Sequence, residues 1–163
     1  MKLMTLTAAW NRLREVRVLQ FSAKSSSQTS GWSASGDGTV IVGLIGNSTM
    51  TYTESGKWRS DCGKELDFNN VYRWTLAEDA GSIRLEHLRF GQNQPIYLLD
   101  LAPTDDTTFQ SVSPHYCGED SYTASMEFKG ESIYLRWTVK GPKKDEQICC
   151  IYGYNKPINS TCL

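Results

Sequence analysis

Apolar and polar residues alternate along much of the chain, and residues 132–154 show this pattern most clearly. Polar or charged residues occupy three of four positions on one parity, while the other parity is apolar and consists of Ile133, Leu135, Trp137 and Val139. A half-buried β-strand shows this two-residue period. Gly141-Pro142 interrupts the strand, and residues 148–154 carry apolar groups on both parities. The segment therefore predicts a β-hairpin whose first strand turns its apolar set toward the core.

Further alternating runs, separated by turn residues, fill most of the remaining sequence. The longest covers residues 66–76, and the others cover 16–21, 39–45, 50–58, 82–90, 95–101 and 122–129. Gly36 and Gly38 predict a tight turn or bulge before the strand 39–45, and Thr7 is the expected N-cap of a short N-terminal helical segment. Eight to ten short strands with turns every ~8–12 residues are typical of all-β proteins. We expect one antiparallel up-and-down β-barrel domain over residues 1–163.

Composition excludes several classes of function. The chain has 163 residues, of which 17 are basic and 18 acidic, and its formal net charge is -1. It therefore lacks the basic surface that nucleic-acid binding usually requires. No apolar run approaches the ~20 residues of a membrane span, and the first residues do not resemble a signal peptide. We expect a cytoplasmic protein without a nucleic-acid partner and without a membrane span.

The cysteines support the same expectation. The chain has five, an odd number, and their spacing matches no zinc site. Cys149 and Cys150 are adjacent, so on a strand they point to opposite faces and do not bond to each other. We expect a reducing compartment with no disulfide, no metal site and no cofactor.

Three blocks of residues carry a family resemblance. They are Val71-Tyr72-Arg73-Trp74, His115-x-Cys117-x-x-Asp120-x-Tyr122 and Trp137-x-Val139-x-Gly141-Pro142-x-Lys144-Asp145. In order and spacing, residues 71–154 resemble the domain of unknown function 6314 family. The resemblance implies a small β-barrel similar to the calycin and lipocalin containers, and it implies no activity.

The second block contains the candidate catalytic residues His115, Asp120 and Tyr122. They lie before and at the start of the predicted strand 122–129, at a rim where polar groups can converge on an opening. His115 and Cys117 are two residues apart, so an extended backbone would put imidazole and thiol on the same side. The alternative is a structural role, in which the Asp120 carboxylate accepts backbone N–H groups and holds a loop onto the barrel. We favour the structural role for Asp120.

The candidate ligand-binding residues are aromatic and arginine side chains on predicted strands. Aromatic rings suit the walls of a cavity for a flat or apolar ligand, and an inward arginine would hold a carboxylate or phosphate. Arg73 and Arg136 oppose the apolar parity of their strands, so they lie outside a packed core but inside a polar cavity. The candidate set is Tyr72, Arg73, Trp74, Tyr122, Arg136 and Trp137.

Three functions stay open from the sequence. The first is binding of a small apolar or amphipathic ligand inside the barrel. The second is an enzyme of the isomerase, cyclase or lyase kind that uses the same cavity. The third is a structural or interaction module whose barrel is filled by side chains. A continuous cavity of ~300 Å³ or more favours the first two. The sequence leaves the ligand and the oligomeric state open.

Overall fold

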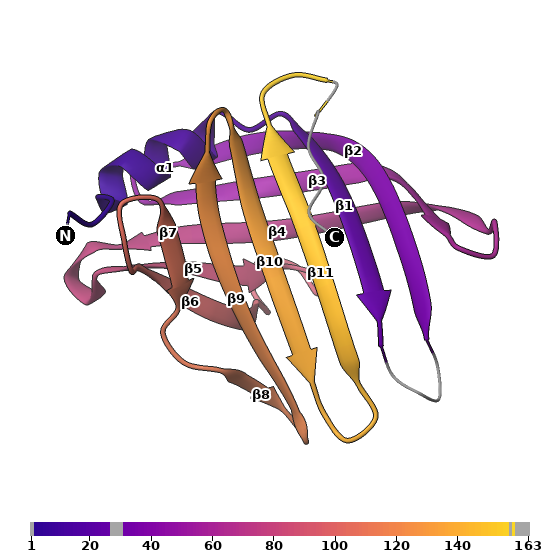
Figure 1. The fold of residues 1–163 in the computed structure, drawn as a ribbon. Helices are drawn as coiled ribbons and strands as arrows, with labels where there is room; N and C mark the ends of the chain where they lie inside the picture. The colour runs from indigo at the N-terminus through magenta and orange to yellow at the C-terminus, as the bar shows by residue number, and fades with distance from the viewer. Residues whose placement is uncertain (1, 27–30, 157, 159–163) are drawn as a thin grey trace.

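The computed structural model describes residues 2–26, 31–156 and 158. Its strands form a closed antiparallel sheet accompanied by one short α-helix (Figure 1). A single 3-10 turn, η1 (Glu78–Ala80), also occurs. In chain order the other elements are α1 (Leu6–Arg14), β1 (Val18–Ser25), β2 (Trp32–Ile45), β3 (Thr49–Ser60), β4 (Glu65–Ala77), β5 (Ser82–His87), β6 (Ile96–Pro103), β7 (Thr108–Ser111), β8 (His115–Cys117), β9 (Asp120–Lys129), β10 (Ser132–Lys140) and β11 (Asp145–Gly153).

The strand order makes the sheet an up-and-down barrel. Each strand from β1 to β6 pairs antiparallel with the next, β7 pairs with β9, and β9, β10 and β11 continue the meander. β11 then pairs with β1 along its whole length, which closes the sheet on itself. Because β7 and β8 lie along the same edge of β9, the eleven strands of the described residues occupy ten positions around the barrel. The predicted antiparallel up-and-down barrel is confirmed.

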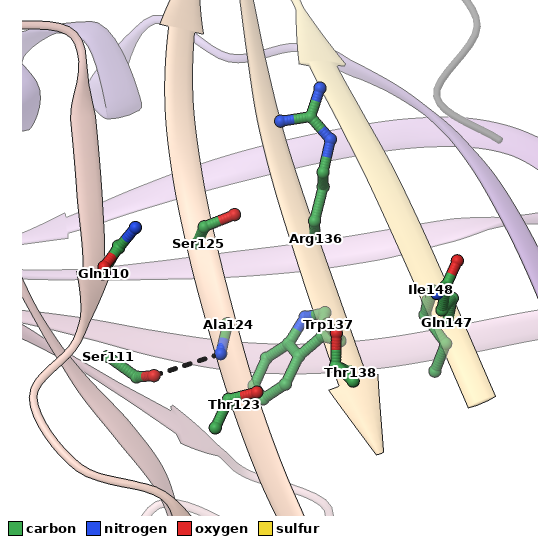
Figure 2. Close-up of a pocket in the computed structure, with 10 residues that line it drawn as sticks. All are labelled: Gln110, Ser111, Thr123, Ala124, Ser125, Arg136, Trp137, Thr138, Gln147 and Ile148. Carbon is green, nitrogen blue, oxygen red and sulfur yellow. Dashed lines mark hydrogen bonds between the residues drawn. The ribbon is translucent and has the colours of Figure 1, made fainter. Parts of the chain in front are cut away.

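A two-residue insertion separates β7 from β8. Between their ladders, the four residues 111–114 lie opposite only the two residues 123–124 of β9. Such a bulge leaves part of the ladder unpaired. The Ser111 hydroxyl fills one gap, because its Oγ accepts a hydrogen bond from the backbone N–H of Ala124 at 3.2 Å (Figure 2). β7 and β8 are therefore one interrupted strand.

The apolar parity of β10 faces the barrel interior, as predicted. Three of its four members, Ile133, Leu135 and Val139, are at most 4% exposed. The fourth, Trp137, lines an internal cavity, while the neighbouring Arg136 forms an ion pair with Glu127. The register predicted from alternation is confirmed for this strand.

The second apolar parity of β11 packs on the outside of the barrel. Cys149 and Ile151 form a small outer cluster with Tyr134, and Ile158 packs against it. Cys149 is also disulfide-bonded, so the prediction of no disulfide is wrong. The prediction rested on an expected reducing compartment and on the opposite faces of Cys149 and Cys150, and the second argument excludes only a bond between these two residues. Cys162 lies outside the described residues.

The glycines of β2 do not form a turn. β2 runs without interruption from Trp32 to Ile45, so the tight turn or bulge predicted at Gly36 and Gly38 is wrong. A Cβ atom at Gly38 would lie 2.2 Å from the carbonyl oxygen of Ser55 on β3, and one at Gly56 would lie 2.1 Å from that of Asp37. These glycines therefore permit a close backbone approach between β2 and β3.

α1 covers one end of the barrel (Figure 1). Its N-cap is Thr5, and not Thr7 as predicted. The Thr5 hydroxyl accepts a hydrogen bond from the backbone N–H of Ala8. At the other end of the helix, the Tyr52 hydroxyl donates a hydrogen bond to the Leu13 carbonyl oxygen at 2.5 Å. This bond satisfies a helix-terminal carbonyl and ties α1 to β3. Within the described residues, no helix is long and apolar enough to cross a membrane.

Beneath α1 the barrel interior is filled. The buried side chains come mainly from the strand ends nearest the helix, because antiparallel strands enter and leave this layer in turn. Ala9, Trp10 and Leu13 of the helix pack onto this layer. Its largest members from the strands are Tyr52, Trp74, Phe109, Met50, Met126, Ile83, Leu99, Leu101 and Ile133.

The close approach of β2 and β3 predicts a specific cost of adding a methyl group. Gly38→Ala should lower the free energy of unfolding by about 1–3 kcal/mol, because backbone atoms must move to make room. Gly153→Ala is the matched control, since its Cβ would meet nothing nearer than Ile158 at 3.5 Å. Urea denaturation of both variants measures the difference, and equal stabilities would contradict this account of the glycines.

Candidate ligand-binding site

The end of the barrel away from α1 is hollow. A cavity of about 530 Å³ lies there, and every strand except β7 and β8 contributes side chains to its lining. In Figure 1 this is the end that carries β8 and the β10–β11 turn. The barrel is thus neither wholly filled nor wholly empty, because the core and the cavity divide its length.

Aromatic and aliphatic side chains form most of the cavity wall. On β3 and β4 the strand order places Trp58 and Phe68 near the mouth and Tyr72 deeper inside. Trp137 projects from β10 on the opposite wall. Such a mainly apolar lining with a few polar groups is typical of small-molecule sites. The other apolar or aromatic lining residues are Leu19, Phe21, Ala23, Trp32, Ala34, Leu85, Leu98, Tyr122, Leu135, Val139, Ile148 and Tyr152.

A carboxyl group lies at the inner end of the cavity. Glu54 is 5% exposed and shares its face of β3 with the core residue Tyr52 and the mouth residue Trp58. The Tyr152 hydroxyl donates a hydrogen bond to Glu54 Oε2 at 2.6 Å. Burial raises the pKa of Glu54 to about 7, although the hydrogen bond from Tyr152 opposes this shift. Near neutral pH the carboxyl group therefore populates both protonation states.

The groups around Glu54 are neutral near pH 7. Burial is the main cause that raises the pKa values of Tyr52, Tyr72, Cys150 and Tyr152, and the Glu54 charge raises them further. Burial, assisted by Arg89, lowers the pKa of His87 below its ordinary value. The His87 ring stacks on Tyr72 with centroids 4.8 Å apart. Glu54 is therefore the group in the cavity wall that can carry charge at neutral pH.

Of the six predicted ligand-binding residues, Tyr72, Tyr122 and Trp137 line the cavity. Trp74 lies below it in the filled layer, 1% exposed, with its ring 5.8 Å from that of Tyr52. Its indole N–H has no hydrogen-bond partner among the described residues.

The two arginines of that set lie outside the cavity. Arg73 Nε is 3.0 Å from Glu86 Oε1, and Arg136 Nη1 is 3.0 Å from Glu127 Oε1. Arg136 borders a separate polar hollow on the outer face of β9, β10 and β11, shown in Figure 2 together with the Ser111–Ala124 bond. Because their strands turn the apolar parity inward, these side chains project to the other face. Neither arginine is a polar anchor inside the barrel.

The catalytic candidates lie at the rim of the cavity and do not form one cluster. Tyr122 lines the cavity, and the His115 ring lies 6.1 Å from the Tyr122 ring and 5.5 Å from the Tyr97 ring. Cys117 is an exposed free thiol. Among the described residues, no cluster of His, Cys, Asp or Glu side chains could hold a metal ion.

Asp120 joins the second and third sequence blocks. Its Oδ2 lies 3.4 Å from Lys144 Nζ, and its carboxyl group packs on Gly141, where a Cβ would lie 2.0 Å from Oδ1. The partners of Asp120 in the described residues are thus a lysine and a glycine of the β10–β11 turn, and not the backbone N–H groups we expected. The arrangement fixes the position of this turn beside β9.

Sequence reasoning missed the polar residues at the inner end of the cavity. Glu54, Asn70, His87 and Cys150 all line it. The sequence did contain a signal for Glu54, because it shares the parity of Tyr52 and Trp58 on a strand whose interior face is otherwise apolar. A charged residue at an inward position indicates either a partner or a cavity.

The raised pKa of Glu54 predicts how stability depends on pH. An acid whose pKa is higher in the folded state binds more protons when folded. Its stabilising contribution to the free energy of unfolding is therefore complete below its unfolded pKa and is lost as the pH rises through its folded pKa. Between pH 4.5 and 8, wild type should therefore lose on the order of 3 kcal/mol relative to Glu54→Gln. Urea denaturation across this range tests the prediction. Glu131→Gln, at an exposed turn, is the control. If the free energy of unfolding depends on pH in the same way in all three proteins, the prediction for Glu54 is refuted.

Comparisons with known proteins place this barrel in a family. No curated protein matches the chain. Among solved structures, a redesigned β-barrel, mFAP1, bound to DFHBI, is similar with a TM-score of 0.40 and 8% identity, covering 87% of this chain and 96% of that chain. The family described as "Family of unknown function (DUF6314)" matches residues 6–153. Since this match runs from α1 to the end of β11, the chain belongs to the DUF6314 family of unknown function.

Proposed function

We propose that this protein binds a small, mainly apolar molecule inside the barrel. The observation that carries the proposal is the cavity of about 530 Å³, whose wall includes Trp58, Phe68 and Trp137. Drug-sized and cofactor-sized ligands occupy sites of roughly 300–1,000 Å³ with this kind of lining. The size of the cavity also weighs against a barrel that is only a filled structural module.

The polar end of such a ligand would lie at Glu54. The sequence suggested arginines for this role, but Arg73 and Arg136 are paired with carboxylates on the outer surface. Inside the cavity the polar groups are Glu54 with its Tyr152 partner, and Asn70 and His87. An amphipathic ligand with one polar end fits this division better than a wholly apolar one.

A second candidate is an enzyme of the isomerase, cyclase or lyase kind. One observation favours it: a carboxyl group with a pKa of about 7 lies against a cavity, and general acid–base catalysis uses groups with such values. Under this alternative Glu54, rather than His115 or Asp120, would transfer the proton. Turnover of a bound ligand would separate it from simple binding.

The finer parts of the sequence-based prediction stay proposals. The closed meander and the internal cavity support a calycin-like or lipocalin-like container. The predicted cytoplasmic location is not tested by the fold, and the disulfide at Cys149 weighs against it, because disulfides are rare in reducing compartments.

Filling the cavity should abolish ligand binding. Ala34→Trp adds an indole to a small side chain in the cavity wall, so it should weaken binding of the neutral dye N-phenyl-1-naphthylamine at least tenfold. Dye fluorescence titration measures the dissociation constant. Native mass spectrometry of the purified protein would show whether a cellular molecule is retained.

Ser35→Trp is the matched control, because Ser35 is exposed on the other face of the same strand. It should leave the dye affinity within about twofold of wild type. Thermal melting of both variants confirms that they are folded. Equal dye affinity in wild type and folded Ala34→Trp, or no dye binding to wild type at all, would overturn the proposal.

A further inference from the structure

The second oxygen of Glu54 is available to a ligand. Tyr152 bonds Oε2, and among the described residues no hydrogen bond reaches Oε1. Glu54 is only 5% exposed, and it forms part of the cavity wall. Oε1 is not among the buried side-chain atoms of the described residues that lack a partner, so it is accessible from the cavity and can accept a hydrogen bond there.

The cavity wall offers no positive charge to balance Glu54. No arginine or lysine of the described residues lines the cavity. Arg73 and Arg136 form ion pairs on the outer face, and Arg17 bonds the backbone carbonyls of residues 14 and 16. His87 lines the cavity, but its lowered pKa leaves it neutral near pH 7. The ligand itself is therefore the available source of a positive charge.

We propose that the cavity selects ligands whose buried end is a cation with N–H donors, such as a protonated amine, held by Glu54 Oε1. The inference rests on the proposed function, because it names the class of ligand for the same cavity. A carboxylate or phosphate ligand would instead bring a second negative charge to a buried acid with no cation beside it, which is strongly unfavourable.

The aromatic lining suits both parts of such a ligand. Rings attract cations placed over their faces, and Tyr72 and Tyr152 lie at the same inner end as Glu54. Nearer the mouth, Trp58, Phe68 and Trp137 offer the flat apolar surface that an aromatic body would contact.

Binding of a cation requires the charged form of Glu54. The titratable groups that face it are Tyr52 on the same strand, Tyr72 on β4, His87 on β5, and Cys150 and Tyr152 on β11, all neutral around pH 7. Because Glu54 is mostly protonated at pH 6 and mostly ionised at pH 8, the affinity for a permanently protonated amine should rise about tenfold between these values.

Three naphthalene probes of nearly equal size test the selection: 2-naphthylmethylamine as the cation, 2-naphthylmethanol as the neutral analogue and 2-naphthoate as the anion. Isothermal titration calorimetry at pH 7.5 should give at least tenfold tighter binding of the amine than of the naphthoate. The affinity of the amine, but not that of the alcohol, should rise between pH 6 and pH 8.

Glu54→Gln removes the charge and keeps the shape of the side chain. It should weaken amine binding roughly tenfold to hundredfold, as expected for the loss of a charge-assisted hydrogen bond, while alcohol binding changes by less than about threefold. Glu127→Gln is the matched control, since it removes a negative charge from the outer face, and it should not change amine binding. Melting curves check that both variants are folded.

The outcomes separate this inference from the proposed function. Naphthoate that binds as tightly as the amine, or an amine affinity unchanged in Glu54→Gln, would overturn the selection for cations while the alcohol still binds in the cavity. Failure of all three probes to bind wild type would overturn the selection and also count against the cavity as a binding site. Loss of alcohol binding in Ala34→Trp assigns that binding to the cavity.

Discussion

A barrel of ten strand positions has an interior too wide to be filled by the side chains of its strands alone. A barrel of about eight strands is just wide enough to be packed by its own side chains, and wider barrels need a plug or retain a cavity. This protein does both, because α1 and the aromatic layer beneath it pack one end and leave the other hollow. Tyr52 lies at the boundary between the packed layer and the cavity. Its hydroxyl donates a hydrogen bond to the Leu13 carbonyl of the helix, and its ring centroid lies 5.8 Å from that of Trp74 and 5.4 Å from that of Tyr152.

The position of Glu54 follows from this division. Two residues beyond Tyr52 on the same face of β3, its carboxyl group leaves the packed layer and enters the cavity. There it is buried enough to lose most of its hydration, and it has one hydroxyl partner and no cation. A carboxyl group can be accommodated in such a place because it can take a proton and become neutral, which is the physical meaning of its raised pKa.

Alternation predicted the strands well because it reports burial on one face, and on β10 it also predicted the register. It failed where the deciding contact involves another strand. Gly38 looked like a turn residue, since the sequence does not show the Ser55 carbonyl that approaches it. The opposed parity of Arg73 did not reveal its orientation, because that depends on whether the interior is packed or polar. The disulfide at Cys149 was missed because the opposite faces of Cys149 and Cys150 exclude only a bond between these two residues.

The most distinctive sequence blocks form the rim of the barrel. The group best suited to binding or catalysis, Glu54, lies at the inner end of the cavity. Asp120 packs on Gly141 and pairs with Lys144, so the second and third blocks meet and set the β10–β11 turn beside β9. Glycine, proline and charged residues are distinctive in sequence because turns need them. A single glutamate among apolar residues is far less conspicuous. Its meaning appears only when nine strands bring their side chains together around it, so a search for the chemistry of this fold should begin at the inner end of the cavity and not at its rim.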